Sequence, residues 1–311
     1  GAWISDIFGL EKVMSSSLSH CHVSGTSESS APLRVDLAGG WTDVRPYPTD
    51  FGGEVVNFAI KHRVRVWKSE KGADSDLEFD FPVPRGSGLG TSSAMNVALA
   101  ALNSSSQAEN FEKIAEQAFL SESKENRCGR QDHWASAFGG FNHLLFIGDS
   151  VERMPFEPMK SSLNWLKKHL VIAYSGISRN SGEMQESVWS RYSNGDEGVI
   201  QGLHKIRSSA REMANGLQQD RRDLVVSALR TVCEGVDMID PTIHDPFRGT
   251  VTSLIESGSI VAWKALGAGG GGCSALLCSP TGKEYATQYI ENEGWQILDW
   301  DFEEHGVQVN G

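Results

Sequence analysis

Residues 84–94 read Pro-Arg-Gly-Ser-Gly-Leu-Gly-Thr-Ser-Ser-Ala, a glycine-rich loop that separates an apolar segment from a run with helical character. Glycines at 86, 88 and 90 allow backbone conformations closed to other residues, so successive N–H groups can face one concavity. The segment 92–102 predicts a helix, whose N-terminus adds a positive partial charge. The loop therefore predicts a cradle for an anion such as a nucleotide's phosphates. The alternative is a plain glycine-rich turn before a helix, which is common.

The composition indicates a globular protein with two domains. The chain has 311 residues, of which 39% are hydrophobic, and a formal net charge of −12. No block of Lys and Arg interrupts the acidic balance, which argues against a nucleic-acid partner. No apolar run is long enough to cross a bilayer and no signal peptide is apparent, so we expect no membrane partner. The five cysteines are scattered without a C-x-x-C pair, which favours a reducing cytoplasm.

Residues 1–30 are predicted to be a lead-in segment, because the sequence from Ser15 to Ser30 is rich in serine. A first domain over residues 31–155 follows. Period-two alternation and apolar runs predict that it opens with strands, and helical spacing then predicts helices before a final strand. The predicted strands are 33–38, 55–60, 64–67, 77–83 and 141–147, and the predicted helices are 92–102, 110–123 and 130–138.

A second domain is predicted over residues 165–311, after a segment punctuated by Pro155 and Pro158. It combines long helical patterns with short apolar strands, so the fold class is α+β. The predicted strands are 169–174, 274–278, 296–300 and 306–309. The predicted helices are 182–192, 197–218, 220–238 and 283–292. A run of small residues over 266–272 forms a further glycine-rich loop.

Several side chains near the first glycine loop suit phosphoryl transfer. Ser92 and Ser93 offer hydroxyls, and Glu122 and Asp132 offer carboxylates. Magnesium is held in proteins by one or two carboxylates together with phosphate oxygens. A kinase needs little more than positioning, charge neutralisation and a group that orients the attacking hydroxyl. A Walker A loop is absent, and the run near residue 270 precedes a strand rather than following one, which argues against a dinucleotide-binding fold.

Three motifs in this order resemble those of the GHMP kinases, the family of galactokinase, homoserine kinase and mevalonate kinase. Residues 84–94 are similar to the family's phosphate loop, residues 34–43 (Arg-Val-Asp-Leu-Ala-Gly-Gly-Trp-Thr-Asp) to its first motif, and residues 267–274 to its third. Gly129-Arg130-Gln131-Asp132, with Gly139-Gly140, resembles the sugar-1-kinase branch. The resemblance implies a ribosomal-S5-like N-terminal half, a ferredoxin-like C-terminal half and a site between them.

The resemblance also implies roles for individual residues. Asp132 would orient or deprotonate the sugar hydroxyl, and Arg34 would lie near the transferred phosphate. Ser92 and Glu122 would bind Mg²⁺, although the order Thr91-Ser92-Ser93 leaves Ser93 as an alternative ligand. The implied ATP contacts are Pro84, Gly86, Ser87, Gly88, Leu89, Gly90, Thr91, Ser92, Ser93, Gly269, Gly270 and Gly271. The implied substrate contacts are Gly40, Trp41, Thr42, Asp43, Arg179 and Ser181.

Each of the main residues also has a structural alternative. Asp132 sits where an Asp commonly caps a short helix. Glu122 is also compatible with a solvated helix face, where lone Glu residues usually lie. Trp41 suits either stacking on a sugar face or simple packing.

The resemblance implies an enzyme that uses ATP and Mg²⁺ to phosphorylate the anomeric hydroxyl of a sugar or sugar phosphate. The sequence Ala-Gly-Gly-Trp-Thr-Asp at 38–43 resembles L-fucokinases. The first alternative is a D-glycero-D-manno-heptose 7-phosphate 1-kinase. The second, from another class, is a sensor that binds sugar and ATP without turnover.

Overall fold

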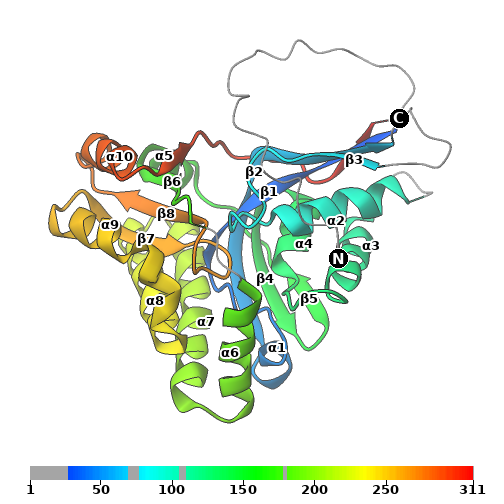
Figure 1. Cartoon of the computed structure of the whole chain (residues 1–311), viewed down its shortest axis with the longest axis horizontal. Helices are drawn as coiled ribbons and strands as arrows, with labels where there is room; N and C mark the ends of the chain where they lie inside the picture. The colour runs from blue at the N-terminus through cyan, green and yellow to red at the C-terminus, as the bar shows by residue number, and fades with distance from the viewer. Residues whose placement is uncertain (1–26, 69–76, 105–109, 178–180, 311) are drawn as a thin grey trace, which may run out of the picture.

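The fold was analysed in a computed structural model, which describes residues 27–68, 77–104, 110–177 and 181–310. Two antiparallel sheets, each covered by helices, stand side by side (Figure 1). None of the helices in these ranges is both long enough and apolar enough to cross a bilayer.

The first sheet has six strands, and a long central hairpin organises it. β1 (Glu28–Ala38) and β2 (Gly53–Lys68) pair antiparallel, with the short helix α1 (Tyr47–Asp50) in their connection. The sheet order is β10-β1-β2-β4-β5, and β3 also pairs with β2. The remaining strands are β3 (Leu77–Asp80), β4 (Phe141–Ile147), β5 (Ser150–Arg153) and β10 (Gln308–Asn310).

Three helices cover one face of this sheet, namely α2 (Thr91–Leu102), α3 (Phe111–Glu122) and α4 (Gln131–Phe138) (Figure 1). In α2, the buried residues Ala94, Val97, Ala98 and Ala101 recur at helical spacing. Their side chains are small, so the helix lies close to the strands beneath it. This packing fixes the N-terminus of α2, which directly follows the first glycine loop.

The second sheet has four strands in the order β7-β8-β6-β9. Each face of this sheet packs against a different hydrophobic cluster, because successive side chains of a strand point to opposite faces. In β6, Leu170 and Ile172 join the main core, whereas Val171 and Ala173 join a second cluster with Phe247. The strands are β6 (Leu170–Tyr174), β7 (Ile260–Ala265), β8 (Cys273–Cys278) and β9 (Gln296–Leu298).

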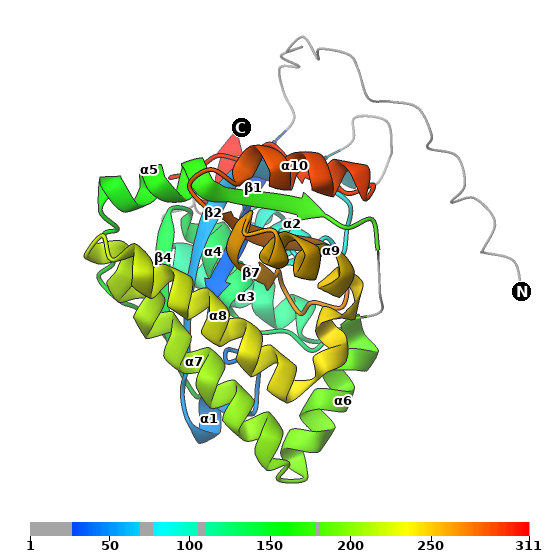
Figure 2. The ribbon, with the colours of Figure 1, turned by 90° about the vertical axis from the view of Figure 1, so that its left-hand side faces the viewer.

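Helices α7 (Glu197–Gln218) and α8 (Arg222–Ile239) run side by side across the molecule (Figure 2). From α7, His204 Nδ1 lies 2.7 Å from the hydroxyl of Tyr47, and Arg211 pairs with Glu54 at 3.0 Å. Because α8 packs against β7, the α7–α8 pair joins the second sheet to the β1–β2 hairpin. The other helices of this half are α5 (Lys160–His169), α6 (Ser181–Ser193), the 3₁₀ turn η1 (Pro241–His244), α9 (Asp245–Glu256) and α10 (Lys283–Asn292).

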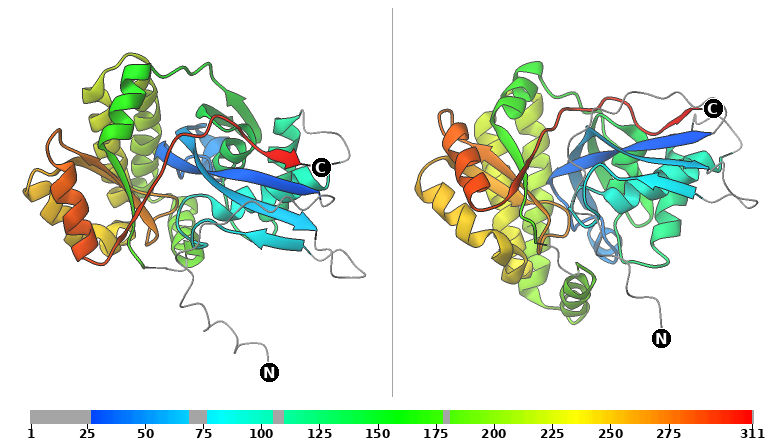
Figure 3. Two further views of the ribbon diagram at one scale, coloured as in Figure 1. Left: turned by 90° about the horizontal axis from the view of Figure 1, so that it is seen from above. Right: turned by 45° about the horizontal axis from the view of Figure 1, so that its top comes forward.

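The last described segment returns to the first sheet. β10 pairs antiparallel with the start of β1, so that Glu28 lies opposite Asn310 (Figure 3). On the way, the Glu303 amide donates to the Ala59 carbonyl at 3.0 Å, and the Glu303 carbonyl accepts from the Gly140 amide at 2.8 Å. The first sheet thus takes β10 from the far end of the chain. The predicted domain boundary between residues 155 and 165 stays a prediction.

The predicted α+β fold class is confirmed, with differences in several elements. The strands expected at 55–60 and 64–67 form the single strand β2. The helix α5 begins inside the predicted boundary segment, and α9, β5 and β7 were not predicted. Residues 28–30 of the predicted lead-in belong to β1, and its residues 1–26 lie outside the described ranges.

Candidate active site

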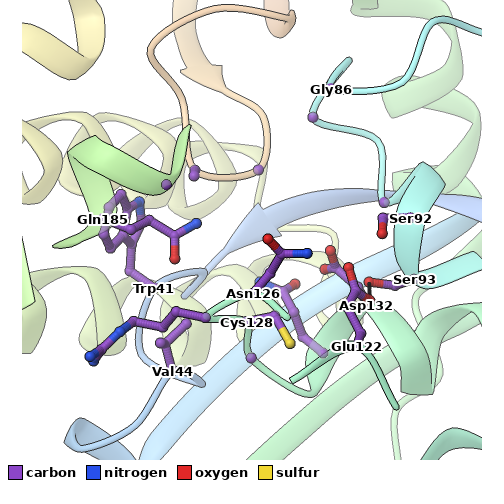
Figure 4. Close-up of a pocket in the computed structure, with 18 of the residues that line it drawn as sticks. Trp41, Val44, Gly86, Ser92, Ser93, Glu122, Asn126, Cys128, Asp132 and Gln185 are labelled. Carbon is purple, nitrogen blue, oxygen red and sulfur yellow. Dashed lines mark hydrogen bonds between the residues drawn. The ribbon is translucent and has the colours of Figure 1, made fainter. Parts of the chain in front are cut away.

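The two glycine-rich loops and the start of α4 enclose a cavity of about 500 Å³ (Figure 4). The first sheet contributes Arg34, and α2 contributes Ser92 and Ser93 at its N-terminus. The second half of the chain contributes residues 266–269 and Gly271, and α6 adds Gln185 and Glu186. The cavity therefore lies between the two halves, as the resemblance implied.

The first glycine loop has the backbone conformation that its sequence predicts. Gly86, Gly88 and Gly90 have φ values of 79°, 81° and 74°, which other residues rarely adopt. A Cβ on Gly88 would lie 2.4 Å from the Leu266 carbonyl oxygen. The two glycine loops are therefore in backbone contact. At the end of the loop, the first N–H groups of α2 have no intrahelical acceptor and suit an anion.

Arg34 connects this loop to α4. Its Nε and Nη2 donate to Asp132 Oδ1 and Oδ2 at 2.7 and 2.8 Å, and its Nη1 donates to the Gly88 carbonyl at 2.6 Å. Burial lowers the pKa of Arg34, but the nearby Asp132 and Asp36 carboxylates outweigh burial and raise it, so the guanidinium stays charged. Asp132 lies in the first turn of α4, whose N-cap residue Arg130 makes no capping hydrogen bond with its side chain. The Asp132 carboxylate is thus held toward the cavity by Arg34.

Asp43 lies at the N-terminus of α4. Its Oδ2 accepts from the Gln131 amide at 3.0 Å, and a Cβ on Gly129 would come within 1.8 Å of the same oxygen. Burial is the main cause that raises the pKa of Asp43 from 3.8 to about 7, and the charges of Asp132 and Asp36 add to it. Asp43 therefore keeps its proton to a higher pH than an ordinary aspartate, and a protonated carboxyl can both donate to and accept from a hydroxyl.

Trp41 combines packing with a place at the cavity wall. It has a φ of 85°, and its ring lies 6.2 Å from that of Trp189 in α6. The side chain is buried, yet it lines the cavity (Figure 4). The indole ring is thereby held in a fixed position at the cavity wall.

Glu122 is buried rather than solvated. Its Oε2 accepts from Ser93 Oγ at 2.8 Å and lies 2.7 Å from His133 Nε2. Burial opposes ionisation, but hydrogen bonds from His133, Ser92 and Ser93 lower the pKa of Glu122. A carboxylate beside two hydroxyls at a helix N-terminus is an oxygen-rich donor set, and oxygen is the ligand that Mg²⁺ prefers. The residues present therefore fit the implied ion, and both serines remain candidate ligands.

The cavity wall carries more negative than positive side chains among the described residues. Its cationic members are Arg34, which is paired, and Arg127, which lies 3.8 Å from Glu186. The carboxylates are Asp43, Glu122, Glu125, Asp132 and Glu186. An anionic acceptor would meet a largely acidic wall.

Many of the sequence-predicted residues line this cavity. These are Arg34, Trp41, Asp43, Gly86, Gly88, Gly90, Thr91, Ser92, Ser93, Glu122, Asp132, Gly269 and Gly271. The predicted contacts Pro84, Ser87, Leu89, Gly270, Gly40 and Thr42 do not line it. Ser87 and Thr42 serve the loops instead: the Ser87 carbonyl accepts from the Cys273 amide, and Thr42 Oγ1 donates to the Gly39 carbonyl at 2.7 Å. Arg179 lies outside the described residues, and Ser181 begins α6 without a described side chain.

Sequence reasoning missed several residues of the cavity wall. Asn126, Arg127 and Cys128 directly precede the Gly129-Arg130-Gln131-Asp132 block, so their proximity to that block was the available signal. Gln185 and Glu186 had no such signal, because α6 reaches the cavity only through the tertiary fold.

Comparisons with known proteins agree with this architecture. Residues 55–140 match the family model described as GHMP kinases N terminal domain. The chain is 23% identical to the D-glycero-alpha-D-manno-heptose 7-phosphate kinase of Campylobacter jejuni, over 91% of this chain and 98% of that protein. It is also 23% identical to the bifunctional fucokinase/GDP-fucose pyrophosphorylase of Arabidopsis thaliana, over 81% of this chain and 30% of that protein.

Among solved structures, a D-glycero-D-manno-heptose 1-phosphate kinase from Bacteroides thetaiotaomicron superposes with a TM-score of 0.70 at 20% identity. The match covers 92% of this chain and 99% of that one, so the whole two-sheet fold is shared. The family-model match, the likeness to kinases along most of the chain and the common fold lead to one conclusion: residues 55–140 form a GHMP kinase N-terminal domain, and the chain is a kinase that is similar to members of that family over most of its length.

Proposed function

We propose that the protein transfers the γ-phosphoryl group of ATP to the anomeric hydroxyl of a sugar. The observation that carries this proposal is the Arg34–Asp132 pair beside the N-terminus of α2. The pair places a fixed carboxylate in the same cavity as the N-terminus of α2, where the first N–H groups of the helix have no intrahelical acceptor. Phosphoryl transfer needs this combination of an oriented acceptor and stabilised phosphate charge.

Each group has a defined task in this proposal. The first glycine loop, Gly269 and Gly271 cradle the phosphates with backbone N–H groups. Arg34 faces the transferred phosphoryl group and keeps Asp132 in place. Asp132 orients the acceptor hydroxyl or takes its proton. Glu122, with Ser92 or Ser93, would hold Mg²⁺, which supplies neutralising charge to the phosphates when it is bound.

The first candidate for the acceptor is an unphosphorylated sugar of the kind that fucokinases use. Trp41 offers an apolar face at the cavity wall, and Asp43 offers a carboxyl group for hydroxyls. The acidic wall around Glu125 and Glu186 favours a neutral sugar over an anionic one. The likeness to the Arabidopsis thaliana fucokinase supports the same candidate.

A heptose 7-phosphate is the second candidate, because the Campylobacter jejuni heptose kinase matches nearly all of this chain. Among the described residues of the cavity wall, Arg127 is the basic group that Asp132 does not already pair, and its pairing with Glu186 at 3.8 Å would have to open for it to bind a remote phosphate. Arg45, Arg179 and Arg191 are further candidates from the sequence. The location predicted from the sequence, the cytoplasm, remains part of this proposal. It is consistent with the free state of the four described cysteines.

A coupled assay of ADP release over a sugar panel tests the proposal. The panel contains L-fucose, D-arabinose, D-galactose and heptose 7-phosphate, and the product is checked for a phosphate on C1. Turnover of L-fucose with kcat/KM far above that of heptose 7-phosphate is the expected result. The reverse preference would support the second candidate. ATP binding without turnover of any sugar would overturn the proposal in favour of a sensor.

A further inference from the structure

Three side chains with different donor atoms meet beside the Glu122 carboxylate. Glu122 ends α3, Cys128 lies in the loop that follows, and His133 belongs to the first half of α4. One ligand atom from each of the three lies within 4.8 Å of the other two. Figure 4 shows the Cys128 sulfur on the side of the cavity where Glu122 and Asp132 lie.

The donor set differs from that of a magnesium site. Mg²⁺ prefers oxygen, whereas a thiolate with an imidazole and a carboxylate is characteristic of Zn²⁺ and chemically similar ions. Metal–ligand distances of about 2.0 to 2.3 Å place tetrahedral ligands about 3.3 to 3.8 Å apart. The observed spread of 4.8 Å thus needs an inward movement of about one ångström.

His133 is already positioned beside Glu122 as a second ligand. Its ring is fully buried, its Nε2 lies 2.7 Å from Glu122 Oε2, and its edge meets the ring of Phe119. The other ring nitrogen, Nδ1, is buried without a hydrogen-bond partner among the described residues. The imidazole and the carboxylate therefore already meet at this point. An ion bound between them needs the two groups to part from 2.7 Å to about 3.3 Å or more, while the Cys128 side chain approaches.

We propose that Glu122, Cys128 and His133 form a site for a thiophilic divalent cation such as Zn²⁺, with a fourth position open to the cavity. The ion takes the place of the Cys128 S–H proton, which is released to solvent. Because Glu122 is shared, occupation of this site removes a carboxylate from the proposed magnesium site. The ion then inhibits phosphoryl transfer, a consequence that rests on the proposed function, whereas the binding itself does not.

Cobalt(II) titration of the full chain tests the site directly, because Co²⁺ bound to a thiolate gives a sulfur-to-metal charge-transfer absorption band. We expect the band in the wild-type protein and its loss in Cys128→Ser and Cys128→Ala. Cys233→Ser is the matched control, since Cys233 Sγ contacts the Trp263 carbonyl at 2.9 Å and does not line the cavity. Cys21→Ser controls for the His20-Cys21-His22 sequence, which lies outside the described residues.

Retention of the band in both Cys128 variants, or its loss in Cys21→Ser, would overturn the proposal. A Zn²⁺ titration at fixed MgATP tests the consequence, with each variant normalised to its own uninhibited rate. The half-inhibiting Zn²⁺ concentration is expected to rise at least about tenfold in Cys128→Ser and to stay unchanged in Cys233→Ser. A cobalt band in a protein that turns over no sugar would support the metal site and reject only the proposed function.

Discussion

Arg34 and Asp132 form a two-pronged ion pair, with Nε to Oδ1 at 2.7 Å and Nη2 to Oδ2 at 2.8 Å. The third guanidinium nitrogen donates to the Gly88 carbonyl at 2.6 Å. One side chain thus sets the distance between the glycine loop and the carboxylate of α4.

Asp132→Asn should lower kcat by about two to four orders of magnitude and leave ATP affinity nearly unchanged. The amide keeps an oxygen for Arg34 but loses the negative charge that orients or deprotonates the acceptor. Steady-state kinetics and ATP titration check this, with Asp301→Asn as an exposed control that pairs with Lys61. Near-normal turnover in Asp132→Asn would remove Asp132 from the chemical step.

Asp43 should make the folded state less stable as pH rises. The folded protein keeps a proton on Asp43 up to about pH 7, whereas the unfolded chain releases it near 3.8. The folded state binds more protons in this window, so this group's contribution to the free energy of unfolding falls as pH rises, by up to about 1.4 kcal/mol per pH unit. Urea unfolding of wild type and Asp43→Asn from pH 5 to 8 measures the difference. The wild type should lose stability relative to the variant up to about pH 7 and no further. Parallel curves across that range would contradict the raised pKa.

Gly88→Ala should weaken ATP binding, because its Cβ would lie 2.4 Å from the Leu266 carbonyl oxygen and push the two glycine loops apart. Gly195→Ala is the matched control. Gly195 has a similar φ of 76°, but a Cβ there meets nothing within 4 Å. The control should cost only the conformational strain of about 1 to 2 kcal/mol, without a change in ATP affinity. Calorimetric titration with ATP measures the affinity of both variants. Equal ATP affinities in Gly88→Ala and Gly195→Ala would show that ATP binding does not need the contact between the two glycine loops.

Lys264→Met should lower the free energy of unfolding by about 3 to 5 kcal/mol, because it leaves the Asp36 carboxylate buried without a partner. Lys264 Nζ donates to Asp36 Oδ2 at 2.8 Å, and both side chains are buried between the two halves. Combining Lys264→Met with Asp36→Asn removes both charges and should recover much of the loss. Urea unfolding measures the stability of the single and the double variant. If Lys264→Met alone is as stable as wild type, water reaches the Asp36 carboxylate.

The sequence predicted best those elements whose periodicity is local. The bounds of α7, α10 and β4 agree with the prediction, because each has a continuous pattern bounded by turn residues. β7 was missed, since Lys264 interrupts its apolar run. That lysine is buried only because Asp36, in a distant strand, neutralises it. The order of the motifs likewise indicated which contiguous stretches would come together, and both glycine loops and Asp132 line one cavity. Their roles stay predictions.

The rest of the candidate site depends on contacts that no local pattern encodes. Glu122 and His133 come from different helices and meet at 2.7 Å, and Glu186 reaches the cavity wall from α6. Trp41 is another residue whose role the sequence could not determine, because stacking on a sugar and packing in the core were equally compatible with it. The structure places its ring against Trp189 and leaves it at the cavity wall.

The pairing of β10 with β1 also determines how the molecule responds to mechanical load. Glu28 lies opposite Asn310 and Ser30 opposite Gln308, so residues 28 and 310 lie at the same end of this strand pair. A force applied between residues 28 and 310 therefore peels the two strands apart one hydrogen bond at a time, rather than shearing all of them at once. The first event under tension would be release of the short β10 strand, while the helices and the second sheet stay folded.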